Sequence, residues 1–214
     1  MKGIYTLAND SAYDQLIAFI NSVNMNLGEN IPICIIPYND NMDKIKEAII
    51  KYPNVGIFND REALDQWDRF TFDCWEAHPK EKQSSWLRPS WYKTNVARKF
   101  VAFDGEFEEF VFFDSDTLVM KPVDDVFQKL KSYDLVFDDW EHIKREPSTE
   151  LEIDLVSQDQ SISKAEIYPL LHCDSFWGSK KGIFSYKILD NLRLELITKK
   201  KIAWVKDGSW WSSS

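Results

Sequence analysis

Apolar runs alternate with helically spaced apolar residues along the N-terminal part of the chain. Residues 3–8, 31–37 and 54–58 are short apolar runs bounded by polar residues, which is typical of buried strands. Between them, residues 13–23 and 43–52 repeat apolar side chains every three or four positions, which predicts two helices. Strand, helix, strand, helix, strand is the order found in parallel sheets. We therefore expect an α/β fold.

The later part of the chain is less regular but also combines expected helices with an expected strand. We expect helices over residues 91–103 and 182–198 and a short strand over residues 134–137. Residues 170–177 form a further apolar run. Residues 144–164 are polar and predict a long surface loop, a kind of segment that is often functional. Because no repeat or linker-like segment divides the chain, we expect one domain over residues 1–214, with a mostly parallel central sheet flanked by helices.

Aromatic residues are concentrated between positions 61 and 92 without a clear period. The segment contains Trp67, Phe70, Phe72, Trp75, Trp86, Trp91 and Tyr92. We expect these rings to pad the core beside the sheet. The alternative is that they form an aromatic wall for a sugar or another acceptor.

The most informative motif is a pair of aspartates that follows the apolar run 110–113. Asp114 and Asp116 are two positions apart, so in an extended chain their side chains project to the same side. Bare carboxylates are costly at the end of a buried strand, and a divalent cation would offset that cost. Magnesium and manganese take one or two protein carboxylates and complete their coordination with phosphates and water. The alternative is a polar turn that simply ends the strand.

Composition excludes several classes of function. The net charge of −9 argues against general nucleic-acid binding and against a polybasic membrane anchor. The three cysteines are widely spaced and form no Cys-x-x-Cys pair, which argues against a disulfide scaffold or a structural zinc site. The sequence shows neither a signal peptide nor a membrane span, so we expect a cytoplasmic location.

Polar residues follow three of the expected strands, at Asn9-Asp10, Asn39-Asp40 and Asp114-Ser115-Asp116. In open α/β sheets, ligands bind at the C-terminal ends of the strands. A nucleotide that lies across these ends, with its phosphates on a metal held by the two aspartates, is a coherent arrangement.

These motifs resemble GT-A-type glycosyltransferases, in particular the glycogenin and galactosyltransferase-like group. The segment Tyr5–Tyr13 resembles that group's first strand and turn, and Phe112–Val119 resembles its metal-binding strand. The resemblance implies a Rossmann-like GT-A fold, a UDP-sugar donor, an acceptor that the motifs do not specify, and Mn²⁺ or Mg²⁺ on Asp114 and Asp116. It also implies that the donor is contacted by Thr6, Leu7, Ala8, Asn9, Tyr13 and Ser115. Of these, Asn9 and Tyr13 would contact the nucleobase.

The resemblance implies further site residues and one departure. The group carries a donor-binding basic residue on the helix before the metal strand, which makes Lys93 the candidate and Arg98 its rival. Asp174 corresponds to a polar residue near the transferred sugar, and Asp207 to an acidic residue near the acceptor, which makes both of them candidate catalytic residues. The group's C-terminal segment supplies a histidine to the metal and has no counterpart here, so we expect a domain that lacks it. We expect His172 to be a buried or half-buried structural residue.

Three other classes of protein share part of this pattern. Haloacid-dehalogenase-like phosphatases also use Asp-x-Asp, as nucleophile and acid–base, but they place Thr where Leu118 stands here. A sugar nucleotidyltransferase requires a Gly- and Arg-rich loop after its first strand, which residues 7–10 do not provide. A non-catalytic nucleotide-sugar-binding module is the main alternative, because the C-terminal segment is missing.

Overall fold

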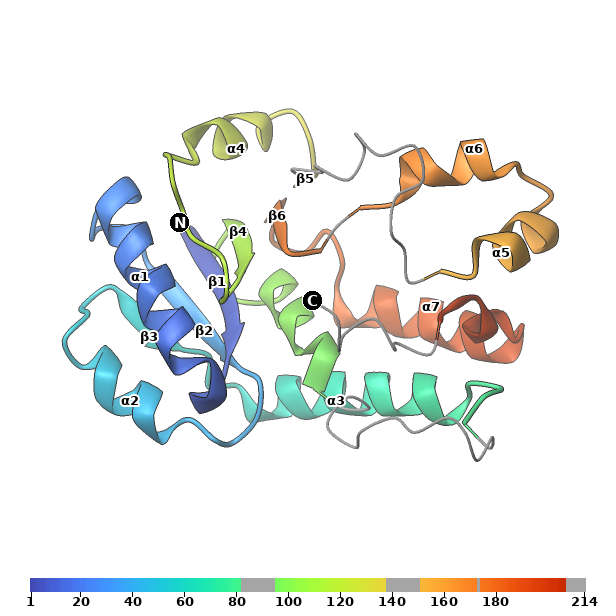
Figure 1. The fold of residues 1–214 in the computed structure, drawn as a ribbon, viewed down its shortest axis with the longest axis horizontal. Coiled ribbons are helices and arrows are strands. Elements are labelled where there is room, and N and C mark those ends of the chain that lie inside the picture. Colours follow the sequence, from blue (N-terminus) through green and yellow to red (C-terminus); the bar gives the residue numbers. More distant parts are fainter. Residues whose placement is uncertain (82–94, 138–150, 173, 207–214) are drawn as a thin grey trace.

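A six-stranded sheet forms the centre of the structure, a computed structural model that describes residues 1–81, 95–137, 151–172 and 174–206 (Figure 1). The strands run in the order β3-β2-β1-β4-β6-β5. Strand β1 pairs in parallel with β2 and β4, and β2 pairs in parallel with β3, whereas β6 is antiparallel to both β4 and β5. The expected α/β fold with a mostly parallel sheet is therefore confirmed. The strands are β1 (Lys2–Ala8), β2 (Ile33–Pro37), β3 (Val55–Ile57), β4 (Glu109–Asp114), β5 (Leu135–Phe137) and β6 (Phe176–Lys180).

Helices cover both faces of this sheet, and a smaller group lies beyond its β5–β6 side (Figure 1). Among the described residues, none of the helices is both long and apolar enough to cross a membrane. The helices are α1 (Tyr13–Leu27), α2 (Asp43–Ile49), α3 (Arg61–Glu76), α4 (Asp124–Lys129), α5 (Ile153–Gln160), α6 (Lys164–Ile167) and α7 (Tyr186–Thr198). The 3₁₀ helices are η1 (Asp10–Ala12), η3 (Asn95–Phe103), η5 (Tyr168–Leu170) and η6 (Lys201–Trp204).

The alternation of side chains along the strands divides the core into two clusters. On β1, Ile4 and Ala8 belong to the cluster covered by α1, α2 and α4, whereas Tyr5 belongs to the cluster covered by α3 and η3. In the second cluster the ring of Trp177 stacks between Phe103 and Phe112, with centroid distances of 4.9 and 5.3 Å. This aromatic stack supports the face of β4 that leads to Asp114.

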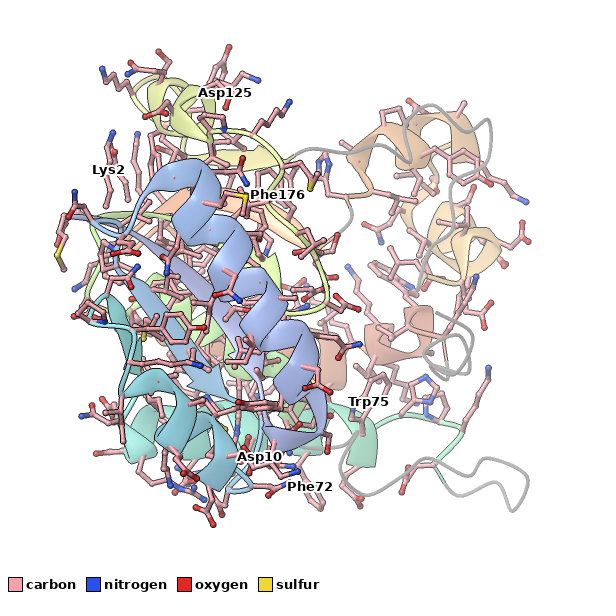
Figure 2. The ribbon with its side chains drawn as sticks, turned by 60° about the vertical axis from the view of Figure 1, so that its left-hand side comes forward. Lys2, Asp10, Phe72, Trp75, Asp125 and Phe176 are labelled. Carbon is pink, nitrogen blue, oxygen red and sulfur yellow. The ribbon has the colours of Figure 1, made fainter. Side chains whose placement is uncertain are left out.

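Residues 61–76 form a regular helix, α3, although their sequence shows no clear period. Asp60 caps this helix by accepting a hydrogen bond from the backbone N–H of Ala63 (3.0 Å). Trp67 and Trp75 on it are buried, as the core-padding interpretation expects, whereas Phe72 is 44% exposed (Figure 2). The aromatic residues Trp86, Trp91 and Tyr92 lie outside the described residues.

Three further boundaries differ from expectation. The described part of the expected helix over 91–103 is a 3₁₀ helix, η3. The C-terminal part of the expected loop 144–164 forms α5. The apolar run 170–177 becomes a strand only from Phe176 onward, and the last long helix begins at Tyr186, where Ser185 caps it.

Candidate metal and donor site

The antiparallel pairing of β6 with β4 brings two aspartates from distant parts of the chain to one edge of the sheet. Strand β4 ends at Asp114, and β6 begins at Phe176 opposite Phe113. The backbone N–H of Asp114 also donates to the carbonyl of Ser175 (2.9 Å). Asp174, which precedes Ser175, therefore lies at the C-terminal edge of β4. Asp10 follows the C-terminal end of β1 at the same edge, and Figure 2 shows it at the opposite end of β1 from Lys2.

The Asp-x-Asp motif forms a tight turn directly after β4. The backbone N–H and the hydroxyl of Thr117 both donate to the carbonyl of Asp114, at 3.2 and 2.7 Å. Ser115 is buried within the turn, Asp114 is half-buried and Asp116 is exposed. The turn anticipated as the alternative interpretation is thus present, and it presents one sheltered and one accessible carboxylate.

Lys99 supplies a basic side chain at this edge, which the sequence patterns did not indicate. Its side chain comes from η3, is only 4% exposed, and forms an ion pair with the carboxylate of Asp174. The ammonium nitrogen lies 6.0 Å from the centroid of the Phe112 ring, on the same face of β4 as Asp114. The Asp174 side chain is 56% exposed, so this pair joins a buried cation to an accessible anion.

Burial dominates the electrostatics of Asp114. Burial raises the pKa of Asp114 to about 7, the ammonium of Lys99 opposes that rise, and the carboxylates of Asp174 and Asp116 add to it. Three carboxylates thus act on one another around a single buried lysine. A divalent cation at Asp114 and Asp116 would neutralise the surplus negative charge, and hard oxygen donors suit Mg²⁺ or Mn²⁺.

The protein offers this cation a partial coordination shell. Within the described part of the chain, no group of three or more His, Cys, Asp or Glu side chains is arranged to hold a metal. His172 does not supply the missing ligand: it is exposed, not buried as expected, and its ring stacks on Phe137 at 4.4 Å. Two carboxylates fit a metal that takes its remaining ligands from phosphates and water.

Arg98 takes a different position from the one expected for a donor ligand. Its guanidinium donates to both carboxylate oxygens of Asp68 on α3, at 2.6 and 2.5 Å, and to the carbonyl of Pro37 at the end of β2, at 2.9 Å. The residue is 3% exposed, so all three nitrogens are directed into the protein. Lys93 and Asp207, the other predicted donor and acceptor residues, lie outside the described residues.

The predicted donor residues of β1 lie mostly within the core. Thr6 and Ala8 are buried on the α1 face, and Leu7 packs against the cluster beneath η3. The hydroxyl of Thr6 has no hydrogen-bond partner among the described residues. Asn9 is half-buried, and its side-chain oxygen accepts from the N–H of Ser11 (3.0 Å), which caps the turn η1.

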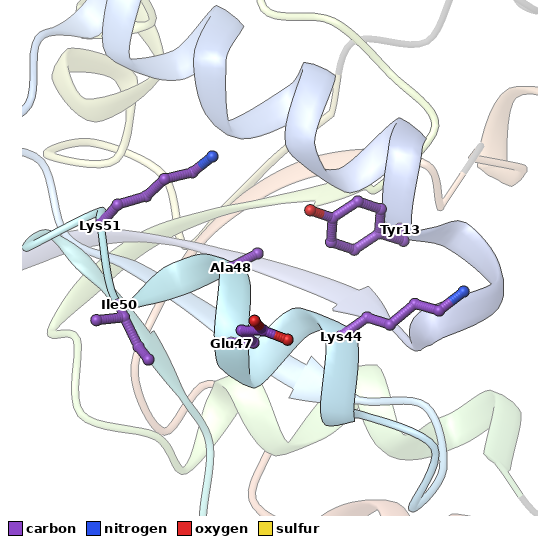
Figure 3. Close-up of a pocket in the computed structure, with 6 residues that line it drawn as sticks. All are labelled: Tyr13, Lys44, Glu47, Ala48, Ile50 and Lys51. Carbon is purple, nitrogen blue, oxygen red and sulfur yellow. The ribbon is translucent and has the colours of Figure 1, made fainter.

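Tyr13 lines a pocket of about 620 Å³ between α1 and α2 (Figure 3). Its ring packs against the α1-side core cluster, which matches a core-facing position better than a free stacking surface. The α2 wall is fixed by Asp10, whose carboxylate accepts from the backbone N–H groups of Lys44 and Ile45 at 3.0 and 3.1 Å. The pocket lining consists of Tyr13, Lys44, Glu47, Ala48, Ile50 and Lys51, and contains neither metal-binding candidate.

Comparisons with known proteins identify a matching family and solved structures of similar fold. A protein-family model described as "Mannosyltransferase putative" matches residues 1–168. The solved structure of galactosyltransferase LgtC, in complex with donor and acceptor sugar analogues, matches with a TM-score of 0.57 and 12% identity, covering 93% of this chain and 66% of LgtC. Mouse xyloside xylosyltransferase 1 in its apo form matches with a TM-score of 0.55 and 8% identity, covering 94% of this chain and 74% of its own.

These similarities confirm the expected GT-A fold. A third solved structure, core-mannan synthase A of Aspergillus fumigatus in an Mn/GDP form, has a TM-score of 0.49 and 10% identity, with coverage of 96% of this chain and 67% of its own. The present chain spans about two thirds of the length of LgtC. Among curated protein sequences, none matches it.

Proposed function

Because the chain belongs to the mannosyltransferase family whose model matches residues 1–168, we propose that it transfers a mannosyl group from GDP-mannose to an acceptor. The observation that carries the proposal is the convergence of Asp114, Asp116, Asp174 and Lys99 at the C-terminal edge of β4. The resemblance to the glycogenin and galactosyltransferase-like group implies a UDP-sugar donor. The family description supports mannose as the transferred sugar instead, and the common nucleotide-activated form of mannose is GDP-mannose.

A divalent cation on Asp114 and Asp116 fits this proposal, because the donor set consists of hard oxygens in a carboxylate-rich environment. Such a cation would stabilise negative charge on the leaving nucleoside diphosphate as a Lewis acid. The turn held by Thr117 keeps both carboxylates at the strand end before any ligand arrives. The protein therefore provides a pre-organised half-site, and the donor diphosphate provides the rest.

Lys99 and Asp174 have complementary roles in this proposal. Lys99 places a fixed positive charge beside the acid pair, where it attracts the donor phosphates and helps to neutralise developing charge. Asp174 is accessible, so its carboxylate can accept hydrogen bonds from hydroxyl groups of the transferred sugar. The ion pair between them orients that carboxylate before the donor binds.

The proposal is tested by measuring the melting temperature with GDP-mannose, GDP, UDP-galactose and UDP, each with Mn²⁺ and with EDTA. A ligand that binds the native state raises the melting temperature by mass action. We expect the largest increase with GDP-mannose and Mn²⁺, and a much smaller one with EDTA. An equal increase with UDP-galactose would reject the mannosyl donor.

Turnover separates an enzyme from a binding module. Release of GDP from GDP-mannose in the presence of Mn²⁺, with water or a panel of mannosides as acceptors, is expected of the transferase. Donor binding without any GDP release would instead indicate the non-catalytic module. If no nucleotide sugar changes the melting temperature or is hydrolysed, both the transferase and the binding module are rejected.

A further inference from the structure

Helix η3 is an unusual support for a functional lysine. It is a nine-residue 3₁₀ helix, whereas runs longer than three or four residues are uncommon because the hydrogen-bond geometry is poor. Tertiary contacts must therefore hold it, and most of its described side chains are buried. Among these buried side chains, Arg98 and Lys99 are adjacent and point to different partners.

The Arg98–Asp68 pair connects η3 to two other parts of the fold. One guanidinium edge makes the two-point contact with Asp68 on α3, and the remaining nitrogen binds the carbonyl of Pro37 at the end of β2. A two-point contact between an arginine and a carboxylate fixes direction as well as distance. These three bonds therefore restrain both the position of η3 and its rotation about its own axis.

Rotation of η3 about its own axis changes the direction in which Lys99 points, because a 3₁₀ helix has three residues per turn. Neighbouring side chains then point about a third of a turn apart, so the direction of Arg98 determines the direction of Lys99. A buried ion pair is weak evidence for a contribution to stability, since well-packed apolar residues often serve as well. A requirement for a fixed orientation of η3 explains the Arg98–Asp68 pair better than a contribution to stability does.

We propose that Arg98 and Asp68 are positioning residues, which hold η3 so that Lys99 meets Asp174 and the donor. This inference rests on the proposed function for the role of Lys99, and it replaces the direct donor contact expected of Arg98. It predicts that loss of the Arg98–Asp68 contact releases Lys99 from its buried position, whether or not a donor is present.

The chain offers a matched control on the same helix. Asp73 of α3 also binds an arginine from another helix, because Arg193 of α7 donates to it at 2.7 Å. Asp68→Asn and Asp73→Asn are thus the same substitution in two interhelical Arg–Asp pairs, and only the first adjoins Lys99. If either variant is too unstable to study, Arg98→Gln and Arg193→Gln form a second pair.

The experiment has two readouts. In the first, full-length protein without ligand is treated with an amine-acylating reagent, and modification of Lys99 is followed by mass spectrometry. We expect Lys99 to react about tenfold faster in Asp68→Asn than in wild type, and at the wild-type rate in Asp73→Asn, because local release exposes a protected group. Lys99 that stays protected in Asp68→Asn and in Arg98→Gln overturns the proposal, as does equal release in the control pair.

The second readout is the affinity for GDP-mannose with Mn²⁺. Asp68→Asn is expected to weaken binding about tenfold in the wild-type background but hardly at all when Lys99→Met is already present, because two residues that act through one another are not additive. If the losses of affinity caused by Asp68→Asn and Lys99→Met add up in the double variant, the positioning role is overturned. If the wild type binds no nucleotide sugar, the proposed function fails, and the acylation rates still decide whether Arg98 and Asp68 position Lys99.

Discussion

The buried ammonium of Lys99 pairs with the exposed carboxylate of Asp174 at the edge where β4 ends and β6 begins. Lys99 is buried, with its ammonium nitrogen above the ring of Phe112, whereas Asp174 is exposed. Removing the carboxylate would leave a buried cation without this partner, and removing the cation would leave only exposed and half-buried anions. The two residues are therefore not equivalent targets for mutagenesis.

Lys99→Met is expected to weaken GDP-mannose binding by one to two orders of magnitude, roughly the cost of losing one buried charge partner. The loss of its positive charge also raises the pKa of Asp114 further, because Lys99 opposes the effect of burial there. Isothermal titration calorimetry with Mn²⁺ measures the change. Lys187→Met, an exposed lysine on α7, is the control, and an equally small effect of both variants would contradict the prediction.

Asp116→Asn keeps the size of the side chain but removes a charged ligand. Because Asp116 is exposed, we expect the melting temperature in EDTA to change little, while the Mn²⁺-dependent part of donor binding is lost. The exposed Asp124→Asn on α4 serves as the control. Unchanged Mn²⁺-dependent binding in Asp116→Asn would remove the acid pair from the metal site.

The pKa of Asp114, raised to about 7 by burial, makes stability depend on pH. Between about pH 4 and pH 7 the folded protein holds a proton at Asp114 that the unfolded chain has lost, so the free energy of unfolding falls as pH rises. Asp114→Asn should abolish that part of the slope. Urea denaturation in EDTA at several pH values measures it, and an identical slope in wild type and variant would contradict the assignment.

Metal affinity should follow the opposite trend. Mn²⁺ competes with the proton on Asp114, so binding is expected to strengthen as pH rises through about 7. The measurement is a calorimetric titration of Mn²⁺ between pH 6 and pH 8, a range chosen on either side of that pKa. A flat profile over this range would show that Asp114 is not a ligand.

Trp177→Ala removes the centre of the aromatic stack formed with Phe103 and Phe112. Replacing a fully packed aromatic residue by alanine typically costs about 3–5 kcal/mol, because a cavity is added to the lost burial. We expect a loss of that size in chemical denaturation. Phe72→Ala, at an aromatic residue that is 44% exposed, should cost much less. Similar losses in both variants would show that the stack does not support the fold.

Tyr13→Ala tests the nucleobase contact predicted from the sequence. If the ring stacks on the base, nucleotide affinity should fall by roughly 1–3 kcal/mol while Mn²⁺ binding is unchanged. Tyr52→Ala is the control, since Tyr52 packs against the same core cluster but does not line the pocket between α1 and α2. If Tyr13→Ala and Tyr52→Ala change nucleotide affinity equally, Tyr13 has a packing role only.

Sequence patterns predicted the sheet and the acid pair because both depend on local order. An apolar run that ends in two aspartates determines a buried strand and its polar end without reference to the rest of the chain. Helix α3 was missed although Leu64, Trp67, Thr71, Cys74 and Trp75 are buried at helical spacing. Additional aromatic residues between them, such as Phe70 and Phe72, obscured that stripe.

Lys99 was missed for a different reason. Helical spacing arguments assume 3.6 residues per turn, and η3 follows a period of three, so the sequence could not tell which of two adjacent basic residues faces the acid pair. Nor could it show that β6 runs antiparallel to β4, which is what brings Asp174 beside Asp114. Both facts depend on tertiary packing between segments far apart in the chain.

The direction of β6 has a consequence for how such an enzyme can diversify. Strand β5 ends, and β6 begins, at the same edge as Asp114, and the chain between these two strands includes α5 and α6, which lie beyond the β5–β6 side of the sheet (Figure 1). Insertions or deletions between β5 and β6 would change the surroundings of Asp114 and Asp174 without shifting the register of either strand. The segment that joins β5 to β6 can therefore vary in length and composition while the parallel half of the sheet stays the same.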